Sequence, residues 1–321
     1  MKILVTGSAG FIGSHLCHML ASQGFEILGI DNLNDYYDKN LKLARKKHFL
    51  DNSGVNFEEV DICDVKKLSK IFDKFNPECV VNLAAQAGVR YSKINPQAYF
   101  LSNINGFTNL VELSREFEIK RFVYASSSSV YGETSEVPFS ESQNLDSPLS
   151  IYAATKLSNE IISYAYSKSF SFYSTGLRFF TVYGPWGRPD MAYFFFLEKI
   201  LKGEEIILFE KGELLRDFTY IDDICESISK IISRHSQFFQ KHQIYNIGNS
   251  NPIKIIDLVK NLEDLLGKKA KIIFAGEEPG EVKQTFSNSD KLFNEISYKP
   301  NTNLADGLKS FVKWHLDFYK I

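Results

Sequence analysis

Residues 2–13 read KILVTGSAGFIG, a short apolar run that leads directly into three glycines, Gly7, Gly10 and Gly13. The run predicts a buried β-strand, and the apolar residues at helical spacing within 15–23 predict a helix after the glycines. A strand-to-helix turn without side chains lets backbone amides and the positive end of the helix dipole approach a pyrophosphate. The spacing is G-x-x-G-x-x-G, however, and on its own it fits an ordinary packed turn equally well.

The next apolar run, EILGID at 26–31, ends in Asp31, 18 residues after Gly13. A carboxylate at this place accepts hydrogen bonds from the hydroxyls of an adenosine ribose and disfavours a 2′-phosphate. The glycine turn and Asp31 together predict a dinucleotide site that takes NAD rather than NADP. The alternative, in which Asp31 is a loop residue or a helix cap, stays open at this point.

The same rhythm of short apolar run and helical stretch continues through the first half of the chain. The further runs are VNFEEVD (55–61), CVVNLAA (79–85), RFVYASSS (121–128) and STGLRFF (174–180). Runs that are apolar on both faces and separated by long crossovers indicate a parallel sheet with helices on both sides. We therefore predict an α/β fold, a Rossmann-type doubly wound parallel sheet.

The pattern loosens after about Arg178, where a Pro, Gly and aromatic-rich stretch begins. A smaller C-terminal α/β lobe that binds the substrate is expected there, interleaved with the first domain. The segment RDFTYIDDICESISKII followed by HQIYNIG predicts one return of the chain to the first sheet. The predicted boundaries are 1–177 with a return segment 218–248 for the cofactor domain, and 178–217 with 249–321 for the lobe.

The ends of the other predicted strands carry polar or small residues that can contact the cofactor. Asp61 and Ile62 are placed to hold the adenine, and the small residues Ala84 and Ala85 let the backbone approach the cofactor. Each of these residues also fits ordinary strand-end chemistry. The full set of predicted cofactor contacts adds Phe11, Ile12, Asn32 and Leu83 to the glycines, Asp31 and these residues, together with Tyr152 and Lys156.

A serine cluster, Ser126 to Ser129, follows the fifth run, and Tyr152 precedes Lys156 by four residues. Residues four apart lie on one face of a helix. A tyrosine has an ordinary pKa of about 10, and lowering it to near 7 requires roughly 4 kcal/mol. A fixed ammonium one turn away and a cationic nicotinamide can supply that shift. The pair Tyr152 and Lys156 therefore predicts an acid–base site beside the cofactor.

Composition excludes several classes of partner. The chain has 321 residues, 44% hydrophobic and 24% charged, and a formal net charge of −2. Without a run of basic residues, no nucleic-acid partner and no anionic lipid surface is expected. The N-terminus lacks a signal-peptide pattern, and no stretch is apolar enough to span a membrane. We expect a cytoplasmic protein.

Metal and disulfide chemistry are also disfavoured. The six histidines show no metal-binding spacing, so no metal is predicted. Four scattered cysteines argue against a disulfide framework and fit a reducing compartment.

Across its whole length the sequence resembles the extended short-chain dehydrogenase/reductase family, through the GxxGxxG turn, the acid after the second strand, the serine cluster and YxxxK. Within that family it is most similar to nucleotide-sugar 4-epimerases, above all UDP-glucuronate 4-epimerases. The longer blocks that carry this resemblance are DNLNDYYD (31–38), NLAAQAGVRYS (82–92), RFFTVYGPWGRPDMA (178–192) and RDFTYIDDI (216–224).

The resemblance implies the reaction and several site residues. Ser127, 25 residues before Tyr152, takes the role of the catalytic serine, and Arg216 contacts the UDP diphosphate. The implied reaction is NAD-dependent 4-epimerisation of a UDP-sugar through a transient 4-keto sugar. The resemblance to UDP-glucuronate 4-epimerases implies conversion of UDP-glucuronate to UDP-galacturonate. The family often has Arg-x-Gly-Asp late in the chain, whereas this sequence has Glu278 to Glu281 there. A homodimer is also implied.

Substrate contacts are expected at Ser128, Ser129, Thr181, Arg188, Arg216 and Glu281. Arg188 offers a planar, bidentate donor for the carboxylate of a uronate. The alternative is that Arg188 pairs with Asp190 on the surface of the lobe.

Other outcomes remain open. One is 4-epimerisation of UDP-glucose, of UDP-N-acetylglucosamine or of its uronate. A dehydratase or decarboxylase is disfavoured, because related enzymes carry acidic residues where this chain has Ser128 and Ser129. A catalytically idle NAD-binding regulatory module is disfavoured because Tyr152, Lys156 and Ser127 are all present.

Overall fold

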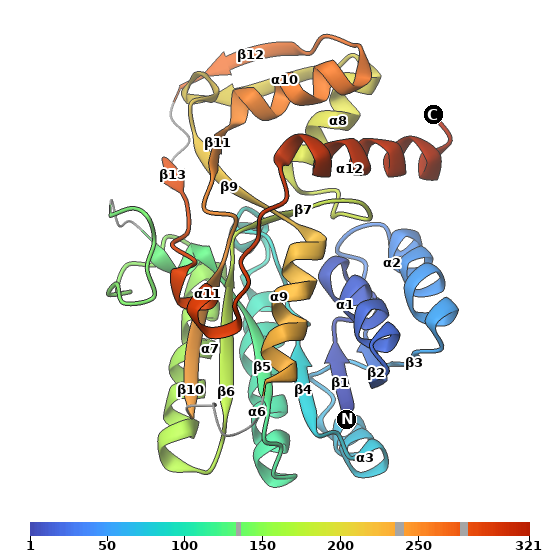
Figure 1. Ribbon diagram of the computed structural model, residues 1–321, viewed down its shortest axis with the longest axis vertical. Coiled ribbons are helices and arrows are strands. Elements are labelled where there is room, and N and C mark those ends of the chain that lie inside the picture. The colour runs from blue at the N-terminus through green and yellow to red at the C-terminus, as the bar shows by residue number, and fades with distance from the viewer. Residues whose placement is uncertain (133–135, 235–240, 277–281) are drawn as a thin grey trace. The chain divides into compact units, whose positions relative to one another are not determined.

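A computed structural model describes residues 1–132, 136–234, 241–276 and 282–321. Among these described residues the chain forms two compact units. The first comprises 1–132, 144–179, 225–234 and 241–245, and the second comprises 136–143, 180–224, 246–276 and 282–321. Figure 1 labels the elements of both units.

The first unit is built on a seven-stranded sheet. In chain order its strands are β1 (Lys2–Thr6), β2 (Glu26–Asp31), β3 (Asn56–Glu59), β4 (Cys79–Asn82), β5 (Phe122–Ser127), β6 (Ser174–Phe179) and β10 (His242–Ile247). Their spatial order is β10-β6-β5-β4-β1-β2-β3, and β1 to β6 pair in parallel. The chain runs outward from β1 on one side and from β4 on the other. This order confirms the predicted doubly wound parallel sheet, whose reversal point is where ligands bind in such folds.

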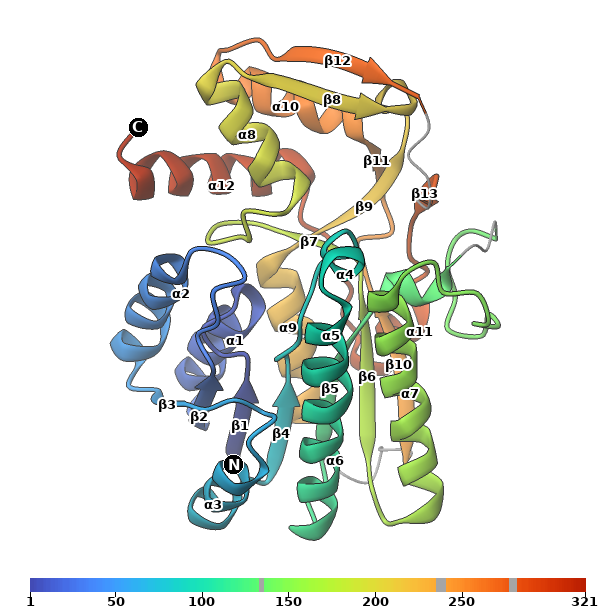
Figure 2. The ribbon, with the colours of Figure 1, turned by 180° about the vertical axis from the view of Figure 1, so that it is seen from behind.

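Helices cover both faces of this sheet. One face carries α1 (Phe11–Ser22) and the later part of α9 (Ile221–Ser233), and the other carries α3 (Val65–Phe75), α6 (Phe107–Glu116) and α7 (Ile151–Ser169), as Figures 1 and 2 show. The shorter helical segments are α2 (Lys39–Arg45), η1 (Lys46–Leu50), η2 (Asp51–Ser53), α4 (Tyr91–Ile94), α5 (Pro96–Tyr99), η3 (Phe100–Gly106) and η4 (Ser128–Tyr131). Side chains such as Leu4, Phe72, Val80, Leu110 and Phe122 form the apolar core between sheet and helices.

The second unit has two small sheets and its own core. One sheet joins β7 (Thr181–Tyr183), β9 (Leu215–Tyr220), β11 (Pro252–Lys254) and β13 (Gln284–Thr285), and the other pairs β8 (Glu205–Phe209) with β12 (Lys271–Ala275). Its helical segments are α8 (Ala192–Lys202), η5 (Glu210–Gly212), α10 (Ile255–Leu266), α11 (Asp290–Ile296) and α12 (Leu304–Tyr319). Ile206, Leu258, Phe194 and Phe311 are fully or almost fully buried in its core.

The units begin and end at other residues than the sequence-based boundaries. Residues 178 and 179 were assigned to the lobe, but they end β6 in the first unit. Two longer segments also lie outside the domains predicted for them. Residues 218–220 were assigned to the return segment, but they end β9, which pairs with β7, β11 and β13 in the second unit. Only the later part of α9 and β10 return to the first sheet. A strand–helix–strand pattern shows that a strand forms, but it does not show which sheet the strand joins.

The second correction concerns 136–143, which the predicted boundaries placed in the first domain. This loop belongs to the second unit, where the Asn246 amide N–H donates to Glu141 Oε1 at 2.8 Å. The Asn246 side chain donates to the Phe139 carbonyl at 2.8 Å, and the Phe139 ring is buried. These are contacts over more than 100 residues of chain, and local sequence patterns carry no information about them.

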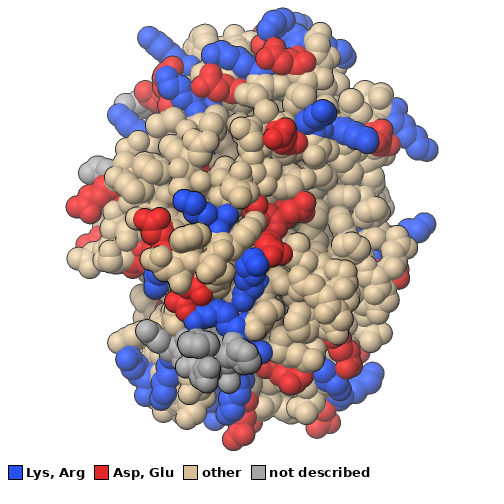
Figure 3. All heavy atoms as spheres, in the orientation of Figure 1, with Lys and Arg blue, Asp and Glu red and all other residues tan. Residues whose placement is uncertain are grey.

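On the face drawn in Figure 3, basic and acidic side chains are interspersed. Within the described ranges, none of the helices combines the length and the apolar character that a membrane crossing requires.

Candidate active site

The glycine turn between β1 and α1 leaves no room for side chains. Gly7 has a φ of +69°, and a Cβ there would lie 2.7 Å from the amide nitrogen of Ala84. A Cβ on Gly13 would lie 2.1 Å from the carbonyl oxygen of Gly7. No side chain caps the N-terminus of α1 at Gly10. The turn is therefore a cradle of backbone atoms at a helix N-terminus, which is the arrangement that binds a pyrophosphate.

Asp31, at the carboxyl end of β2, faces this turn. Its Oδ2 accepts the Ala9 amide N–H at 3.2 Å, and its Oδ1 accepts the Leu33 amide N–H at 2.8 Å. Burial raises the pKa of this carboxyl group, while the charge of Lys42 and the amide bonds act in the opposite direction. Asp31 thus also stabilises its own loop through these hydrogen bonds, as the alternative interpretation of Asp31 as a loop residue predicted. Its role as a ribose acceptor stays a prediction.

Lys42 is a buried cation that the sequence analysis missed. Its side chain is 5% exposed, and Nζ donates to the Asn34 carbonyl at 2.8 Å and to the Asn34 side chain. The loop that follows Asp31 is therefore held at Asp31 and again at Asn34. In sequence Lys42 is one lysine among several in a polar helix, so its residue type gave no signal.

The ends of β2 and β3 are joined by side chains. The Asn32 amide donates to Asp61 Oδ2 at 2.8 Å, and Asp61 Oδ1 accepts the Cys63 amide N–H at 2.7 Å. Ile62 packs into the apolar core, and a Cβ on Gly106 would lie 2.5 Å from its Cγ1. The structure thus brings Asn32 and Asp61 together at this edge. The Ile62 side chain is only 5% exposed and lies in the apolar core instead.

The end of β4 lies against the glycine turn. Thr6 Oγ1 accepts the Ala84 amide N–H at 3.1 Å, and the Leu83 amide donates to the Thr6 carbonyl at 3.2 Å. Leu83, Ala84 and Ala85 are half-buried. Of the two remaining predicted contacts on α1, Phe11 is buried and Ile12 is half-buried.

Tyr152 and Lys156 occupy the first turns of α7. The helix begins after Ser150, whose hydroxyl accepts the Ala153 amide N–H at 3.1 Å. The Lys156 side chain is 3% exposed, and Nζ donates to the Ala125 carbonyl at 2.8 Å. This bond fixes the ammonium against β5, the strand that ends in Ser127.

Tyr152 packs against an aromatic ring, and Ser127 is hydrogen-bonded to a neighbouring serine. The half-buried Tyr152 ring packs edge-on against Tyr99, with the ring centroids 6.1 Å apart. Tyr99 in turn donates its hydroxyl to the Ala87 carbonyl at 2.8 Å, in the loop after β4. The Ser127 hydroxyl donates to Ser129 Oγ and accepts the Ser129 amide N–H, both at 3.2 Å.

Burial lowers the pKa of the Lys156 ammonium to about 8. At neutral pH the side chain is still mostly protonated, so a positive charge lies one helical turn from Tyr152. A fixed positive charge at this distance favours the ionised form of a phenol.

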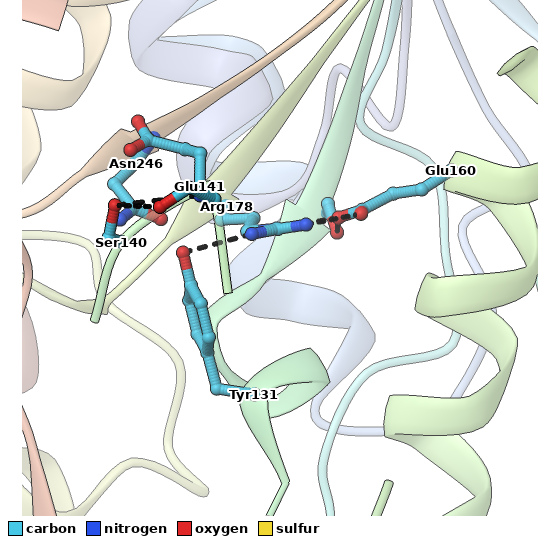
Figure 4. Close-up of polar contacts among 8 residues, drawn as sticks. Tyr131, Ser140, Glu141, Glu160, Arg178 and Asn246 are labelled. Carbon is cyan, nitrogen blue, oxygen red and sulfur yellow. Dashed lines mark hydrogen bonds and ion pairs between the residues drawn. The ribbon is translucent and has the colours of Figure 1, made fainter. Parts of the chain in front are cut away.

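The Ser126 side chain belongs to a separate buried network, of which Figure 4 labels Tyr131, Glu160 and Arg178. It donates to Glu160, whose two carboxylate oxygens accept hydrogen bonds from Nε and NH2 of Arg178 at 3.0 and 2.7 Å. NH1 of Arg178 donates to the Tyr131 hydroxyl oxygen at 2.9 Å. Neither Glu160 nor Arg178 was among the residues expected from the sequence. An arginine inside the apolar run STGLRFF was the signal, because a fully buried strand position that carries a charge requires a buried partner.

The predicted substrate residues of the second unit are described within that unit alone. Thr181 begins β7, and Arg216 lies in β9 with NH1 donating to the Leu215 carbonyl at 2.9 Å. Arg188 pairs with Asp190, with Nε donating to Oδ1 at 2.9 Å. This ion pair is the contact that the sequence analysis gave as the alternative for Arg188. Glu281, and the departure at Glu278 to Glu281, lie outside the described residues.

The fold and this site define an α/β protein with the glycine turn of a dinucleotide-binding fold and a tyrosine–lysine pair on α7. Residues 3–248 match the family described as NAD dependent epimerase/dehydratase family, and the chain belongs to that family. The predicted family membership is thereby confirmed, and so is NAD as the cofactor of the family.

Similar proteins cover the chain from end to end. It is 47% identical to Protein CapI of Staphylococcus aureus, with all of both chains covered. It is 45% identical to UDP-glucuronate 4-epimerase 4 of Arabidopsis thaliana, over 99% of this chain and 76% of the plant protein. Its structure matches UDP-glucuronic acid 4-epimerase from Bacillus cereus, solved with UDP-glucuronic acid and NAD, at a TM-score of 0.92 and 36% identity, over 99% and 100% of the two chains.

The residues of the first unit fit NAD. The cradle that a Cβ would fill suits the pyrophosphate, Asp31 at the end of β2 suits the ribose, and buried Lys156 lies at the edge of the sheet where the nicotinamide end belongs.

The lowered pKa of Lys156 makes the stability of the protein depend on pH in one direction. Below pH 8 the ammonium is protonated in the folded and in the unfolded chain, and folding bears the full cost of burying the charge. Between about pH 8 and 10.5 the folded protein binds fewer protons at this group than the unfolded chain, so the free energy of unfolding rises with pH. The gain is on the order of 3 kcal/mol over this range.

We predict that this gain disappears in Lys156→Met, which has no group to titrate at this position. The measurement is urea unfolding of both proteins without added NAD, at several pH values from 7 to 10. The free energy of unfolding of the wild type should rise relative to that of the variant as pH increases. A constant difference between the two proteins would show that Lys156 keeps its ordinary pKa.

Proposed function

We propose that this protein is an NAD-dependent 4-epimerase that interconverts UDP-glucuronate and UDP-galacturonate. The observation that carries the proposal is the set of groups on α7, β5 and η4: Tyr152 and buried Lys156 on one helix, with hydroxyls and no carboxylate at Ser127 to Ser129. The UDP-glucuronate 4-epimerases among the similar proteins support the same substrate.

NAD, when bound, accepts a hydride from C4 of the sugar and later returns it. The role that we give Tyr152 is that of the base that takes the proton of the C4 hydroxyl, directly or through the hydroxyl of Ser127. Lys156 keeps Tyr152 ionised and holds the nicotinamide ribose. After the 4-keto sugar has turned its other face to the cofactor, Tyr152 gives the proton back, and the configuration at C4 is inverted. No second redox substrate is consumed.

Epimerisation requires that nothing else happens to the 4-keto sugar. Elimination needs a base at C5, and the positions beside the catalytic serine offer only the hydroxyls of Ser128 and Ser129. The keto sugar formed from UDP-glucuronate is also a β-keto acid, which loses CO₂ when its carboxylate stands perpendicular to the plane of the ketone. We propose that Arg188, Ser129 and Thr181 hold the carboxylate in another orientation, and that Arg216 binds the diphosphate.

We also propose that the protein is a cytoplasmic homodimer. Exposed apolar side chains occur on two helical segments of the first unit that pack against each other: Ile94, Phe100 and Leu101 from α4 to η3, and Ile161 and Tyr164 on α7. Ile94 is 76% exposed and Ile161 is 61% exposed. A second copy would remove these side chains from water. The cysteines are scattered along the sequence without close pairs, which suits the cytoplasm. The product would serve as an activated donor in polysaccharide biosynthesis.

The direct test of the function is incubation of the purified protein with a panel of UDP-sugars, followed by NMR of the products. We expect UDP-glucuronate to give UDP-galacturonate without net formation of NADH. Rapid epimerisation of UDP-glucose with no turnover of UDP-glucuronate would replace the uronate by a neutral substrate.

We predict that Tyr152→Phe lowers turnover by roughly 10²- to 10⁴-fold, because positioned proton transfer contributes that much. The ring still packs against Tyr99, so the melting temperature and the amount of bound NAD should match the wild type. Turnover close to the wild-type value would remove Tyr152 from the mechanism.

We predict that Arg188→Ala lowers kcat/KM for UDP-glucuronate by roughly 10- to 100-fold, the worth of a charge-assisted hydrogen bond. A neutral UDP-hexose should be affected much less, and UDP-pentose should appear as a side product. Asp190→Asn is the matched control, because it loosens the ion pair but leaves the guanidinium in place. An equal loss in both variants would mean that Arg188 only braces its loop.

We predict that Ile161→Glu weakens the dimer, because it places a charge on the exposed apolar face of α7. Analytical ultracentrifugation should show a dimer for the wild type and a larger share of monomer for the variant. Leu43→Glu, which adds the same charge at an exposed apolar position of α2 outside the proposed face, serves as the control. A wild type that is monomeric at micromolar concentration would contradict the proposed assembly.

A further inference from the structure

Four polar side chains form a network inside the first unit. Ser126, Tyr131, Glu160 and Arg178 are all buried, with exposed fractions of 2%, 3%, 6% and 3%. They come from four different elements: the end of β5, the end of η4, the middle of α7 and β6. Figure 4 shows the Arg178 side chain between Tyr131 and Glu160.

All three nitrogens of the Arg178 guanidinium donate hydrogen bonds in this network. Nε and NH2 donate to the two oxygens of Glu160, and NH1 donates to the hydroxyl of Tyr131. The guanidinium also lies over the Tyr131 ring, 4.8 Å from its centroid. Burial alone would lower the pKa of Arg178, but the bonds to Glu160 outweigh it and raise the pKa, so the group stays a cation. A lysine has no planar fork and cannot serve both partners in this way.

Each partner of Arg178 is next to a candidate catalytic group. Glu160 follows Lys156 by one turn of α7, and Ser126, which donates to Glu160, directly precedes Ser127. Tyr131 is the last residue of η4, the short turn that carries Ser128 and Ser129. Arg178 therefore connects the helix of the tyrosine–lysine pair to the turn of the serines, without itself being one of these residues.

Stability alone does not explain such a network. Burying two charges is costly, and well-packed apolar side chains of similar size often give equal or greater stability. Apolar side chains, however, do not fix one register between a helix and a turn, whereas directional hydrogen bonds do. The network therefore fixes a defined geometry at some cost in stability, and it lies where α7 meets η4.

We propose that Arg178 is a positioning residue, which holds α7 in one register against η4 and so fixes Tyr152 relative to Ser127. The proposal rests on the proposed epimerase function. Its consequence is specific: loss of the network should slow the proton transfer and leave the binding of cofactor and of sugar nucleotide largely unchanged.

Three variants separate positioning from folding. Arg178→Lys keeps the charge beside Glu160 but gives up the simultaneous bond to Tyr131. Tyr131→Phe removes only the hydroxyl that joins Arg178 to η4. The double variant Glu160→Met with Arg178→Met removes both charges together, so that neither is left buried without its partner, and it is the variant expected to fold if a single change does not.

The chain offers a matched control on the same helix. Tyr166 of α7 donates to Glu112 Oε2 at 3.0 Å, and Glu112 also accepts from Nε of Arg115 at 3.1 Å. This tyrosine, glutamate and arginine repeat the chemistry of the buried network in a partly exposed setting, towards the other end of α7. Tyr166→Phe should leave all kinetic constants at the wild-type values.

The readouts are kcat and KM for the UDP-sugar that the wild type epimerises, bound NAD, melting temperature, and the dependence of kcat on pH. We expect kcat to fall by roughly 10-fold or more in Arg178→Lys and in the double variant, because small misplacement of reacting groups is costly. KM and bound NAD should change little. If the Ser127 hydroxyl relays the proton, it donates a hydrogen bond to ionised Tyr152, so displacing it should raise the pKa of Tyr152 and move the acid limb of the kcat profile to higher pH.

The proposal is overturned if Tyr131→Phe and the double variant fold and keep the wild-type kcat and acid limb, or if the variants lower only the melting temperature. The substrate accepted by the wild type decides the proposed function independently, because the effect of Arg178 is judged from the ratio of each variant to the wild type on that same substrate.

Discussion

The bond between the Lys156 ammonium and the Ala125 carbonyl is the contact on which the site depends. It holds a buried positive charge against Ala125 of β5, two residues before Ser127. Lys156 itself lies one helical turn after Tyr152 on α7. The charge is expensive to bury, as the lowered pKa of Lys156 shows. A fixed positive charge so close to a phenol favours its ionised form, and this is the role that we propose for Lys156 towards Tyr152. In the proposed mechanism, the glycine cradle and Asp31 bind the cofactor at the carboxyl edge of the same sheet.

Much of the first unit could be predicted because its signals are local. The apolar runs, the glycines before α1 and the spacing of Tyr152 and Lys156 each act within one strand, turn or helix. The sheet order then follows from the preference of such units for parallel, right-handed connections. The clash that a Cβ on Gly13 would make with Gly7 gives the physical reason for the glycine spacing.

What the sequence did not reveal depends on contacts between distant segments. Residues 218–220 form a strand as expected, but in the second unit, because their partners in β11 and β13 lie far along the chain. Glu160 and Arg178 have ordinary sequence neighbours, and only the fold brings them together. Arg188 shows the opposite case, since its contact with Asp190 is local and was foreseeable, whereas a contact with substrate is not a property of the sequence alone.

In the proposed reaction a hydride leaves C4 of UDP-glucuronate and returns to the same carbon on the other face. The most direct measurement uses UDP-glucuronate labelled with deuterium at C4, with NMR of the product. We expect UDP-galacturonate that keeps the label at C4. When unlabelled substrate is used in D₂O, we expect a product with no deuterium at C5. Loss of the C4 label to solvent, deuterium at C5, or UDP-pentose as the main product would contradict it.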